Sequence, residues 1–240
     1  MTSTSPTFSR MDRREEIASN LAAVRERIAA ACDASGRSAE EITLIAVTKT
    51  YPASDVLHLV HLGVADIGEN RDQEAAPKAL EVGPGPRWHF IGQLQRNKCK
   101  SVVTYASMVH SVDSVELAQT LADQASKRRE EPLDALVQVS LDDDPRRGGA
   151  PSSAFLAVAE SIATAGSLRL RGLMAVAPLG EAPEAAFARL VRYITLFRAD
   201  HPDATVVSAG MSDDLDTAIA HGATHVRIGS ALLGKRTALR

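Results

Sequence analysis

Ile42-Thr43-Leu44-Ile45-Ala46-Val47-Thr48-Lys49 is a nearly continuous apolar run, rich in β-branched residues, that ends at a lysine. An apolar run of this length predicts a strand buried on both faces, as in parallel sheets flanked by helices. Lys49 would then lie at the carboxyl end of the strand, where α/β sheets and barrels bind their ligands. A lysine there can form an imine with an aldehyde or ketone, although the alternative is a surface lysine whose charge stays in water.

The alternation of a short apolar run with a helix-length segment continues along the chain. Strands are predicted at 42–47, 65–68, 88–92, 108–111, 135–141, 170–176, 205–209 and 224–229. Eight such units in 240 residues predict an α/β fold, a single (β/α)8 TIM barrel, with an open doubly wound sheet as the competing fold.

An additional N-terminal helix is expected at 11–32, because apolar residues recur there at three- and four-residue steps, as at Ile17, Leu21, Val24 and Ile28. We expect residues 1–10 to be a disordered tail and residues 11–240 to form one barrel domain.

Composition argues against several classes of partner. The formal net charge is −3 and charges of both signs are interspersed, so we expect neither nucleic-acid nor membrane binding. We also expect no secretory signal and no membrane span. Cys32 and Cys99 lie in different segments without metal-type spacing, which predicts no disulfide framework and no metal site and fits a cytoplasmic protein.

Two glycine turns near the end of the chain point to an anion site. Residues 206–214 read as a strand, a turn at Gly210 and a helix that Ser212 or Asp213 could cap. The run Arg227-Ile228-Gly229-Ser230 supplies a second turn after the eighth strand. Barrels often hold a phosphate between the loops after strands seven and eight, so these turns predict a phosphate site.

Five separated motifs resemble one known family. They are Ala46-Val47-Thr48-Lys49, Ile67-Gly68-Glu69-Asn70, the run 88–98 (WHFIGQLQRNK), Arg171-Gly172-Leu173-Met174, and the pair 208–214 (SAGMSDD) with 226–230 (VRIGS). In this order they look like the pyridoxal-phosphate homeostasis proteins, which share the fold of the alanine racemase amino-terminal barrel. The resemblance covers about residues 42–234.

The resemblance implies a cofactor and a set of residues around it. Lys49 would hold pyridoxal 5′-phosphate as a Schiff base, Asn70 would lie beside the ring, and Arg227 would lie near the pyridine nitrogen. The residues implied around the phosphate are Ser208, Met211, Ser212, Gly229 and Ser230.

The sequence departs from the family pattern at a few places. Gln93 and Arg96 fall where many relatives have proline and serine, and Ser230 falls where threonine is frequent, which keeps a hydroxyl. The segment 142–149 (DDDPRRGG) differs from a lysine-bearing loop of some members, which puts a second cofactor site in doubt. We interpret this segment as a solvated charged turn.

The favoured function is a non-enzymatic pyridoxal-phosphate binding protein in intracellular vitamin B6 homeostasis, a monomer that passes cofactor to apo-enzymes. A cation opposite the pyridine nitrogen, such as Arg227, opposes its protonation and makes the ring a poorer electron sink.

An amino-acid racemase or decarboxylase with the same cofactor is the alternative; related racemases carry a further β-domain, whereas six residues follow Gly234 here. A cofactor-free aldolase that uses Lys49 is the third hypothesis.

Other polar residues have simpler explanations. His58 and His61 are expected on a solvated helix face, because no acidic residue is placed to complete a metal site with them. His89 and His110 lie on predicted strands and are expected to be hydrogen-bonded within the barrel, although His89 could face the site.

Overall fold

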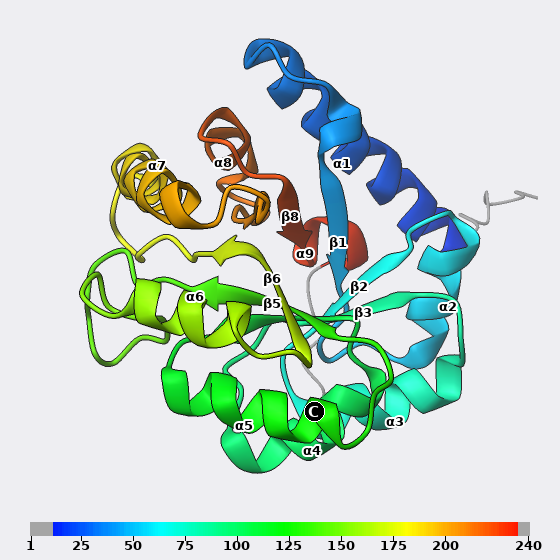
Figure 1. Cartoon of the computed structure of the whole chain (residues 1–240). Coiled ribbons are helices and arrows are strands. Elements are labelled where there is room, and N and C mark those ends of the chain that lie inside the picture. The colour runs from blue at the N-terminus through cyan, green and yellow to red at the C-terminus, as the bar shows by residue number, and fades with distance from the viewer. Residues whose placement is uncertain (1–11, 235–240) are drawn as a thin grey trace, which may run out of the picture.

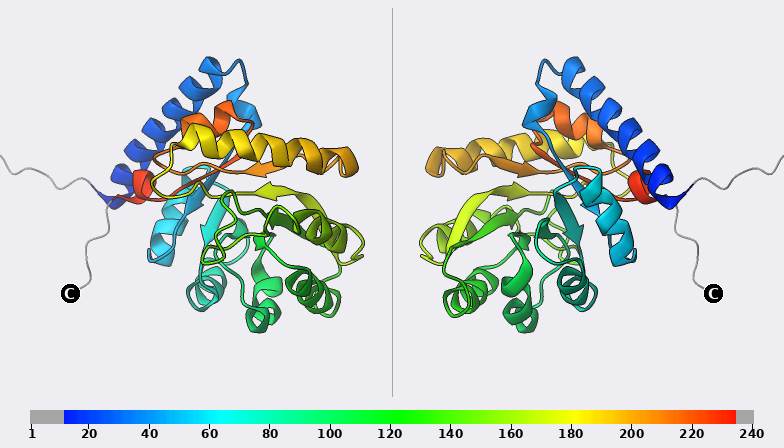
Figure 2. Two further views of the ribbon diagram at one scale, coloured as in Figure 1. Left: turned by 90° about the vertical axis from the view of Figure 1, so that its left-hand side faces the viewer. Right: turned by 90° about the vertical axis from the view of Figure 1, so that its right-hand side faces the viewer.

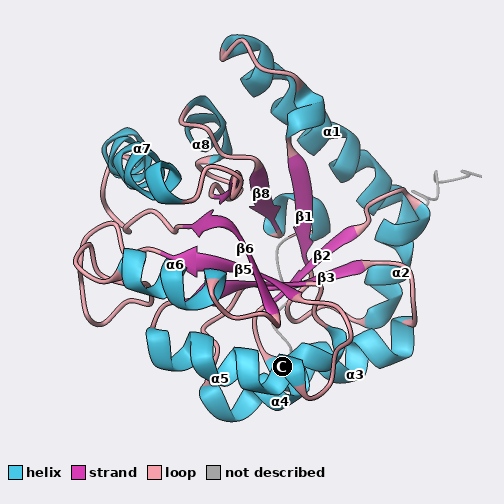
Figure 3. Cartoon of the chain, viewed as in Figure 1, coloured by secondary structure: helices cyan, strands magenta, loops and turns pink. Residues whose placement is uncertain are grey.

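The computed structural model describes residues 12–234, in which eight parallel strands close into a barrel. The strands are β1 (Thr43–Val47), β2 (Asp66–Glu69), β3 (Arg87–Phe90), β4 (Met108–Val112), β5 (Leu133–Gln138), β6 (Leu168–Met174), β7 (Val206–Ser208) and β8 (His225–Ile228). Consecutive strands pair in order, and β8 pairs with β1 to close the cylinder. The predicted barrel is confirmed, with the strands at the centre and helices around them (Figures 1 and 3).

The helices of the described residues are α1 (Arg13–Ala34), α2 (Ala53–His61), α3 (Asp72–Val82), α4 (Cys99–Tyr105), α5 (Val115–Ser126), α6 (Phe155–Ala163), α7 (Pro183–Asp200), α8 (Leu215–Ala220) and α9 (Ser230–Leu233), with 3-10 turns at Ala39–Glu41 and Arg96–Lys98. The additional helix α1, predicted at 11–32, packs against α8 and α9 (Figure 2). It thus braces the end of the chain that carries the two predicted phosphate turns.

Local sequence explains how several elements begin. The hydroxyl of Ser114 accepts a hydrogen bond from the amide of Leu117 and caps α5. Pro183 occupies the first position of α7, where its missing N–H is harmless. These two helices therefore start where side-chain chemistry satisfies or spares the backbone.

Apolar side chains form separate layers outside and inside the barrel. Ala46 and Ile67 pack with buried residues of α1, α2 and α8 in a layer between strands and helices. Side chains alternate along a strand, so Ile45 and Val47 face the opposite way, into the barrel. Lys49 follows Val47 by two residues and continues this inward series at the carboxyl end of β1.

The bounds of several strands differ from those predicted. The run expected at 135–141 is observed as β5 at Leu133–Gln138, and the run at 88–92 as β3 at Arg87–Phe90. Val139 and Leu141 stay buried after β5 ends, and the amide of Val139 still donates to the carbonyl of Met174, so the apolar pattern continues past the bounds of the strand. The predicted tail at 1–10 lies outside the described residues. Between residues 12 and 234, no helix combines the length and apolarity needed to cross a membrane.

Candidate functional site

The backbone on the amino side of Lys49 is fixed by buried polar contacts. The amide of Thr48 donates to the carbonyl of Gly68 at 3.0 Å, and its hydroxyl donates to Glu69 Oε1 at 2.6 Å. Lys78 Nζ, from α3, donates to the carbonyl oxygen of Thr48 at 2.9 Å and pairs with Glu69. Glu69 and Lys78 are both buried, so this pair holds the strand end at Lys49 from behind.

The backbone on the carboxyl side of Lys49 is held in a turn. Thr50 has φ +70°, a conformation that costs a β-branched residue about 1–3 kcal/mol and persists only where its surroundings enforce it. Its amide donates to Glu74 Oε2 at 3.1 Å, and the amide of Tyr51 donates to the carbonyl of Thr48 at 3.0 Å. The lysine thus projects from a strand end that is tied on both sides.

Asn70 follows β2 directly and packs backbone to backbone on Gly92. A Cβ at position 92 would lie 2.1 Å from the carbonyl oxygen of Asn70, so only glycine allows this approach. The position of Asn70 therefore depends on a glycine of the 88–98 motif.

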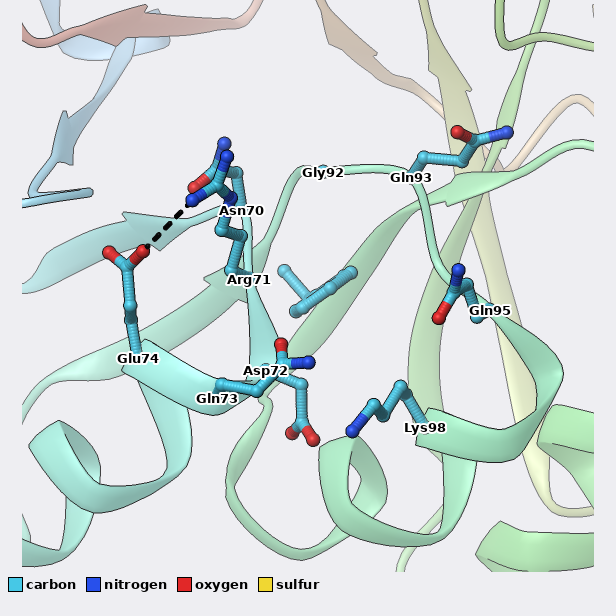
Figure 4. Close-up of a pocket in the computed structure, with 10 residues that line it drawn as sticks. Asn70, Arg71, Asp72, Gln73, Glu74, Gly92, Gln93, Gln95 and Lys98 are labelled. Atoms are coloured by element: carbon cyan, nitrogen blue, oxygen red, sulfur yellow. Dashed lines mark ion pairs between the residues drawn. The ribbon is translucent and has the colours of Figure 1, made fainter.

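A cavity of about 580 Å³ opens beside Asn70, between the start of α3 and the segment before α4 (Figure 4). It is lined by Asn70, Arg71, Asp72, Gln73, Glu74, Phe90, Gly92, Gln93, Gln95 and Lys98. Arg71 and Glu74 form an ion pair across its rim. Lys49 and the two glycine turns do not line this cavity, so of the predicted site residues only Asn70 contributes to its lining.

The two predicted phosphate turns meet at their hydroxyls. Ser230 Oγ donates to Ser212 Oγ at 3.4 Å, which brings the loop after β7 next to the start of α9. The prediction that Ser212 or Asp213 caps the next helix is wrong, because α8 begins at Leu215 with Asp214 before it. Asp214 Oδ1 accepts a hydrogen bond from the amide of Met211 at 2.6 Å and so closes the turn.

Gly229 brings the second turn close to β1. A Cβ at position 229 would lie 3.3 Å from the carbonyl oxygen of Val47, two residues before Lys49. The turn after β8 therefore borders the strand end that carries the lysine.

Arg227 is buried inside the barrel near these turns. Its Nη1 donates to Ser208 Oγ at 2.7 Å and its Nη2 donates to the carbonyl oxygen of Ala175 at 2.9 Å. Burial lowers the pKa of Arg227 to about 10, so the guanidinium keeps its charge at neutral pH. Within residues 12–234, no carboxylate pairs with it. The guanidinium thus has no ion-pair partner among the described residues, although the carboxylate of Asp214 acts on its charge from a longer distance.

Three residues that the sequence did not single out support this site. Arg27 of α1 donates to the carbonyl oxygen of Ser212 and pairs with Asp216, which ties the turn after β7 to the additional helix. Lys78 and Glu74 hold the strand end at Lys49, as described above. Their partners lie 9 to 189 residues away in sequence and on other elements, so no local pattern could have revealed them.

The charged segment 142–149 contains two internal ion pairs. Asp142 pairs with Arg147 at 2.7 Å, and Asp144 pairs with Arg146 at 2.8 Å. Arg147 also donates to the carbonyl oxygens of Val176 and Ala177, which joins the loops after β5 and β6. Two ion pairs therefore form within this segment, whereas Asp143 accepts hydrogen bonds from Ser152 outside it.

Comparison with known proteins places this chain in a family. Residues 19–237 match the model of the alanine racemase N-terminal domain. The pyridoxal phosphate homeostasis protein of Mycobacterium leprae is 43% identical over 241 residues, which cover 93% of this chain and 94% of the relative. The protein of the same name from Escherichia coli K12 is 39% identical over 232 residues, covering 92% and 97%.

Solved structures agree with this assignment. PipY of Synechococcus elongatus, solved with PLP bound, is 32% identical with a TM-score of 0.80, and the match covers 91% of this chain and all of PipY. The alanine racemase of Corynebacterium glutamicum shares the fold, with a TM-score of 0.70 at 16% identity over 95% of this chain and 63% of the racemase. From the family model and the curated relatives together, the chain belongs to the pyridoxal phosphate homeostasis protein family.

Proposed function

We propose that this protein binds pyridoxal 5′-phosphate as a Schiff base on Lys49 and acts in intracellular vitamin B6 homeostasis. The observation that carries the proposal is the braced lysine at the end of β1, bordered by the two turns joined through Ser212 and Ser230. The names of the relatives and the PLP-bound structure of PipY support it.

The residues around the barrel mouth fit the cofactor. The buried guanidinium of Arg227, without an ion-pair partner among the described residues, suits an electron-rich pyridine nitrogen. The hydroxyls of Ser212 and Ser230 and the start of α9 at Gly229 suit the phosphate, together with Met211 of the same turn. Asn70 would lie beside the ring. When bound, the cofactor supplies an aldehyde that reacts reversibly with amines.

For Ser208 we propose a role other than the phosphate contact that the resemblance implies. Its hydroxyl accepts a hydrogen bond from Arg227 and contacts His110 Nδ1 at 2.9 Å, and the residue is fully buried. We therefore assign Ser208 to hold Arg227 rather than to bind the phosphate.

The proposed role is that of a carrier without turnover. Arg227 disfavours protonation of the pyridine nitrogen, which weakens the stabilisation of carbanions that racemases and decarboxylases require. Structures that share this fold include an alanine racemase, so activity needs a direct test. Optical rotation of single L-amino acids should stay constant with the loaded protein, and steady racemisation at enzymatic turnover would replace the carrier role by the racemase.

Lys49 is tested by spectroscopy and mapping. The loaded protein should absorb in the visible range, and borohydride reduction followed by peptide mapping should place the cofactor on Lys49. Lys49→Ala should abolish the band, whereas Lys98→Ala, which changes a lysine of the neighbouring cavity, should keep it. A colourless protein that takes up no added cofactor would favour the cofactor-free aldolase, and an adduct on another lysine would reject the site.

The proposed acceptors are PLP-dependent apo-enzymes, and the proposed carrier is a cytoplasmic monomer. Cys32 and Cys99 are both free and buried, which fits a reducing compartment. Reactivation of an apo-enzyme by the loaded protein, compared with an equal amount of free cofactor, tests delivery. Sedimentation of the unloaded and loaded protein tests the monomer.

A further inference from the structure

A continuous chain of side chains crosses the inside of the barrel. At the amino-terminal end, Arg87 pairs with Asp66 through two hydrogen bonds of 2.7 and 2.6 Å. Asp66 Oδ1 is 2.8 Å from His89 Nε2, and His89 Nδ1 is 2.8 Å from His110 Nε2.

At the carboxyl end of the strands the chain reaches the proposed cofactor site. His110 Nδ1 is 2.9 Å from Ser208 Oγ, which accepts from Arg227 at 2.7 Å. Asp66, His89, His110, Ser208 and Arg227 are all buried, whereas the side chain of Arg87 is 62% exposed. The chain thus links an exposed ion pair at one end of the barrel to Arg227 at the other.

The direction of every hydrogen bond in the chain follows from one constraint. An ionised Asp66 only accepts, so His89 donates from Nε2. A neutral His89 then accepts at Nδ1, so His110 donates from Nε2 and accepts at Nδ1 from the hydroxyl of Ser208. Because the O–H of Ser208 donates to His110, the hydroxyl oxygen of Ser208 can only accept a hydrogen bond from Arg227. All donors and acceptors match when both imidazoles are neutral.

The charges around the imidazoles favour this neutral state of His110. Burial lowers the pKa of His110 well below its usual range, and the positive charge of Arg227 lowers it further. The imidazole of His225 bonds instead to the hydroxyl of Thr224 at 2.9 Å and is not part of this series of hydrogen bonds. A proton on His89 would reverse the bonds up to Ser208, because His89 Nδ1 would then donate.

We propose that Asp66, His89 and His110 are positioning residues that fix the hydroxyl of Ser208 as an acceptor and so orient Arg227, which couples the exposed end of the barrel at Arg87 to the cofactor end. The effect on the cofactor rests on the proposed function, whereas the series of hydrogen bonds from Arg87 to Arg227 does not depend on it. Without the charge of Asp66, the proton of His89 is no longer fixed on Nε2. The tautomer of His110 and the direction of the Ser208 hydroxyl should then no longer be fixed either.

The experiment compares the unaltered protein with Asp66→Asn and Arg87→Gln. Asp134→Asn is the matched control, because Asp134 lies at the same end of β5 and pairs with Arg169 and Arg171 at 3.4 and 3.5 Å, without a link to Ser208. ¹⁵N NMR of histidine-labelled, unloaded protein reads the protonation of each ring nitrogen. Absorbance titration reads the Kd for pyridoxal 5′-phosphate, and circular dichroism reports folding.

In the unaltered protein, His89 and His110 should both carry their proton on Nε2. Asp66→Asn should change the signals of His110 and raise the Kd about fivefold or more, as is typical of residues coupled through a shared network. Arg87→Gln, a surface change that should fold normally, should shift the same signals in the same direction, while Asp134→Asn leaves signals and Kd unchanged.

Two results would overturn the inference: His110 signals that do not respond to Asp66→Asn and Arg87→Gln, or an equal response to Asp134→Asn. If the unaltered protein binds no pyridoxal 5′-phosphate, the proposed function fails. The NMR comparison still decides whether Asp66, His89 and His110 are coupled through their hydrogen bonds. The failures of the two proposals are therefore distinguishable.

Discussion

Lys78 Nζ donates a hydrogen bond of 2.9 Å to the carbonyl oxygen of Thr48, the residue immediately before Lys49. The same ammonium pairs with Glu69 Oε1, which also accepts from the hydroxyl of Thr48. Glu69 Oε2 is buried without a partner among residues 12–234, so Glu69 depends on Lys78 for its charge compensation. One buried ion pair therefore holds the strand end that carries Lys49.

Lys78→Met should destabilise the protein by about 3–5 kcal/mol, because it leaves the Glu69 carboxylate buried without its cation. The double variant Lys78→Met with Glu69→Gln should regain a large part of that loss, since no charge is then stranded. Urea unfolding of the single and double variants measures the difference. Equal stability of Lys78→Met and the unaltered protein would show that Glu69 does not need its partner.

Gly92→Ala should cost about 1–3 kcal/mol of unfolding free energy and displace Asn70, because the new Cβ meets backbone atoms that cannot rotate away. Gly166→Ala is the control, since a Cβ at position 166 meets nothing within 4 Å. Thermal unfolding checks the stability, and a cofactor titration checks the site. An alanine at 92 that is tolerated as well as one at 166 would contradict the close packing of Asn70 on Gly92.

Much of the fold was readable from the sequence because parallel strands buried on both faces leave continuous apolar runs, as residues 42–47 do. His89 and His110 were expected to be hydrogen-bonded within the barrel, and this prediction is confirmed. The chain that joins them to Asp66 was not foreseen, because its members come from different strands. A buried carboxylate at the start of β2 gives no local signal of its distant partners.

The same limit applies to the site. The residues at the ends of β1, β7 and β8 could be proposed from motifs, since strand ends and glycine turns have sequence signatures. The cap of α8 was misassigned because three consecutive polar residues, Ser212, Asp213 and Asp214, all suit an N-cap. The helix begins after Asp214, whose side chain accepts from the amide of Met211 upstream of the helix, and only the three-dimensional turn reveals this.

Stability should fall with acidification between about pH 6.5 and pH 4 through His225. Burial lowers the pKa of His225 to about 4, so the folded state resists a proton that the unfolded chain accepts near pH 6.5. Since the unfolded state binds more protons in this window, its stability relative to the folded state rises as the pH falls. The contribution of His225 is at most about 3 kcal/mol.

His225→Gln should flatten this pH dependence in part, because the lowered pKa of His110 adds to it in the same direction. His61→Gln, an exposed histidine at the end of α2, should leave the profile unchanged. Urea unfolding at pH 7.5, 5.5 and 4.5 provides the comparison. A His225→Gln profile parallel to that of the unaltered protein would remove His225 as a source.

Arg27→Ala should weaken cofactor binding about fivefold with little loss of stability, because Arg27 holds the carbonyl of Ser212 in the turn assigned to the phosphate. Its ion pair with Asp216 is partly exposed and should contribute under about 1 kcal/mol to folding. Arg14→Ala is the matched control on an exposed position of the same helix. Absorbance titration of both variants measures the Kd, and equal affinities would separate α1 from the site.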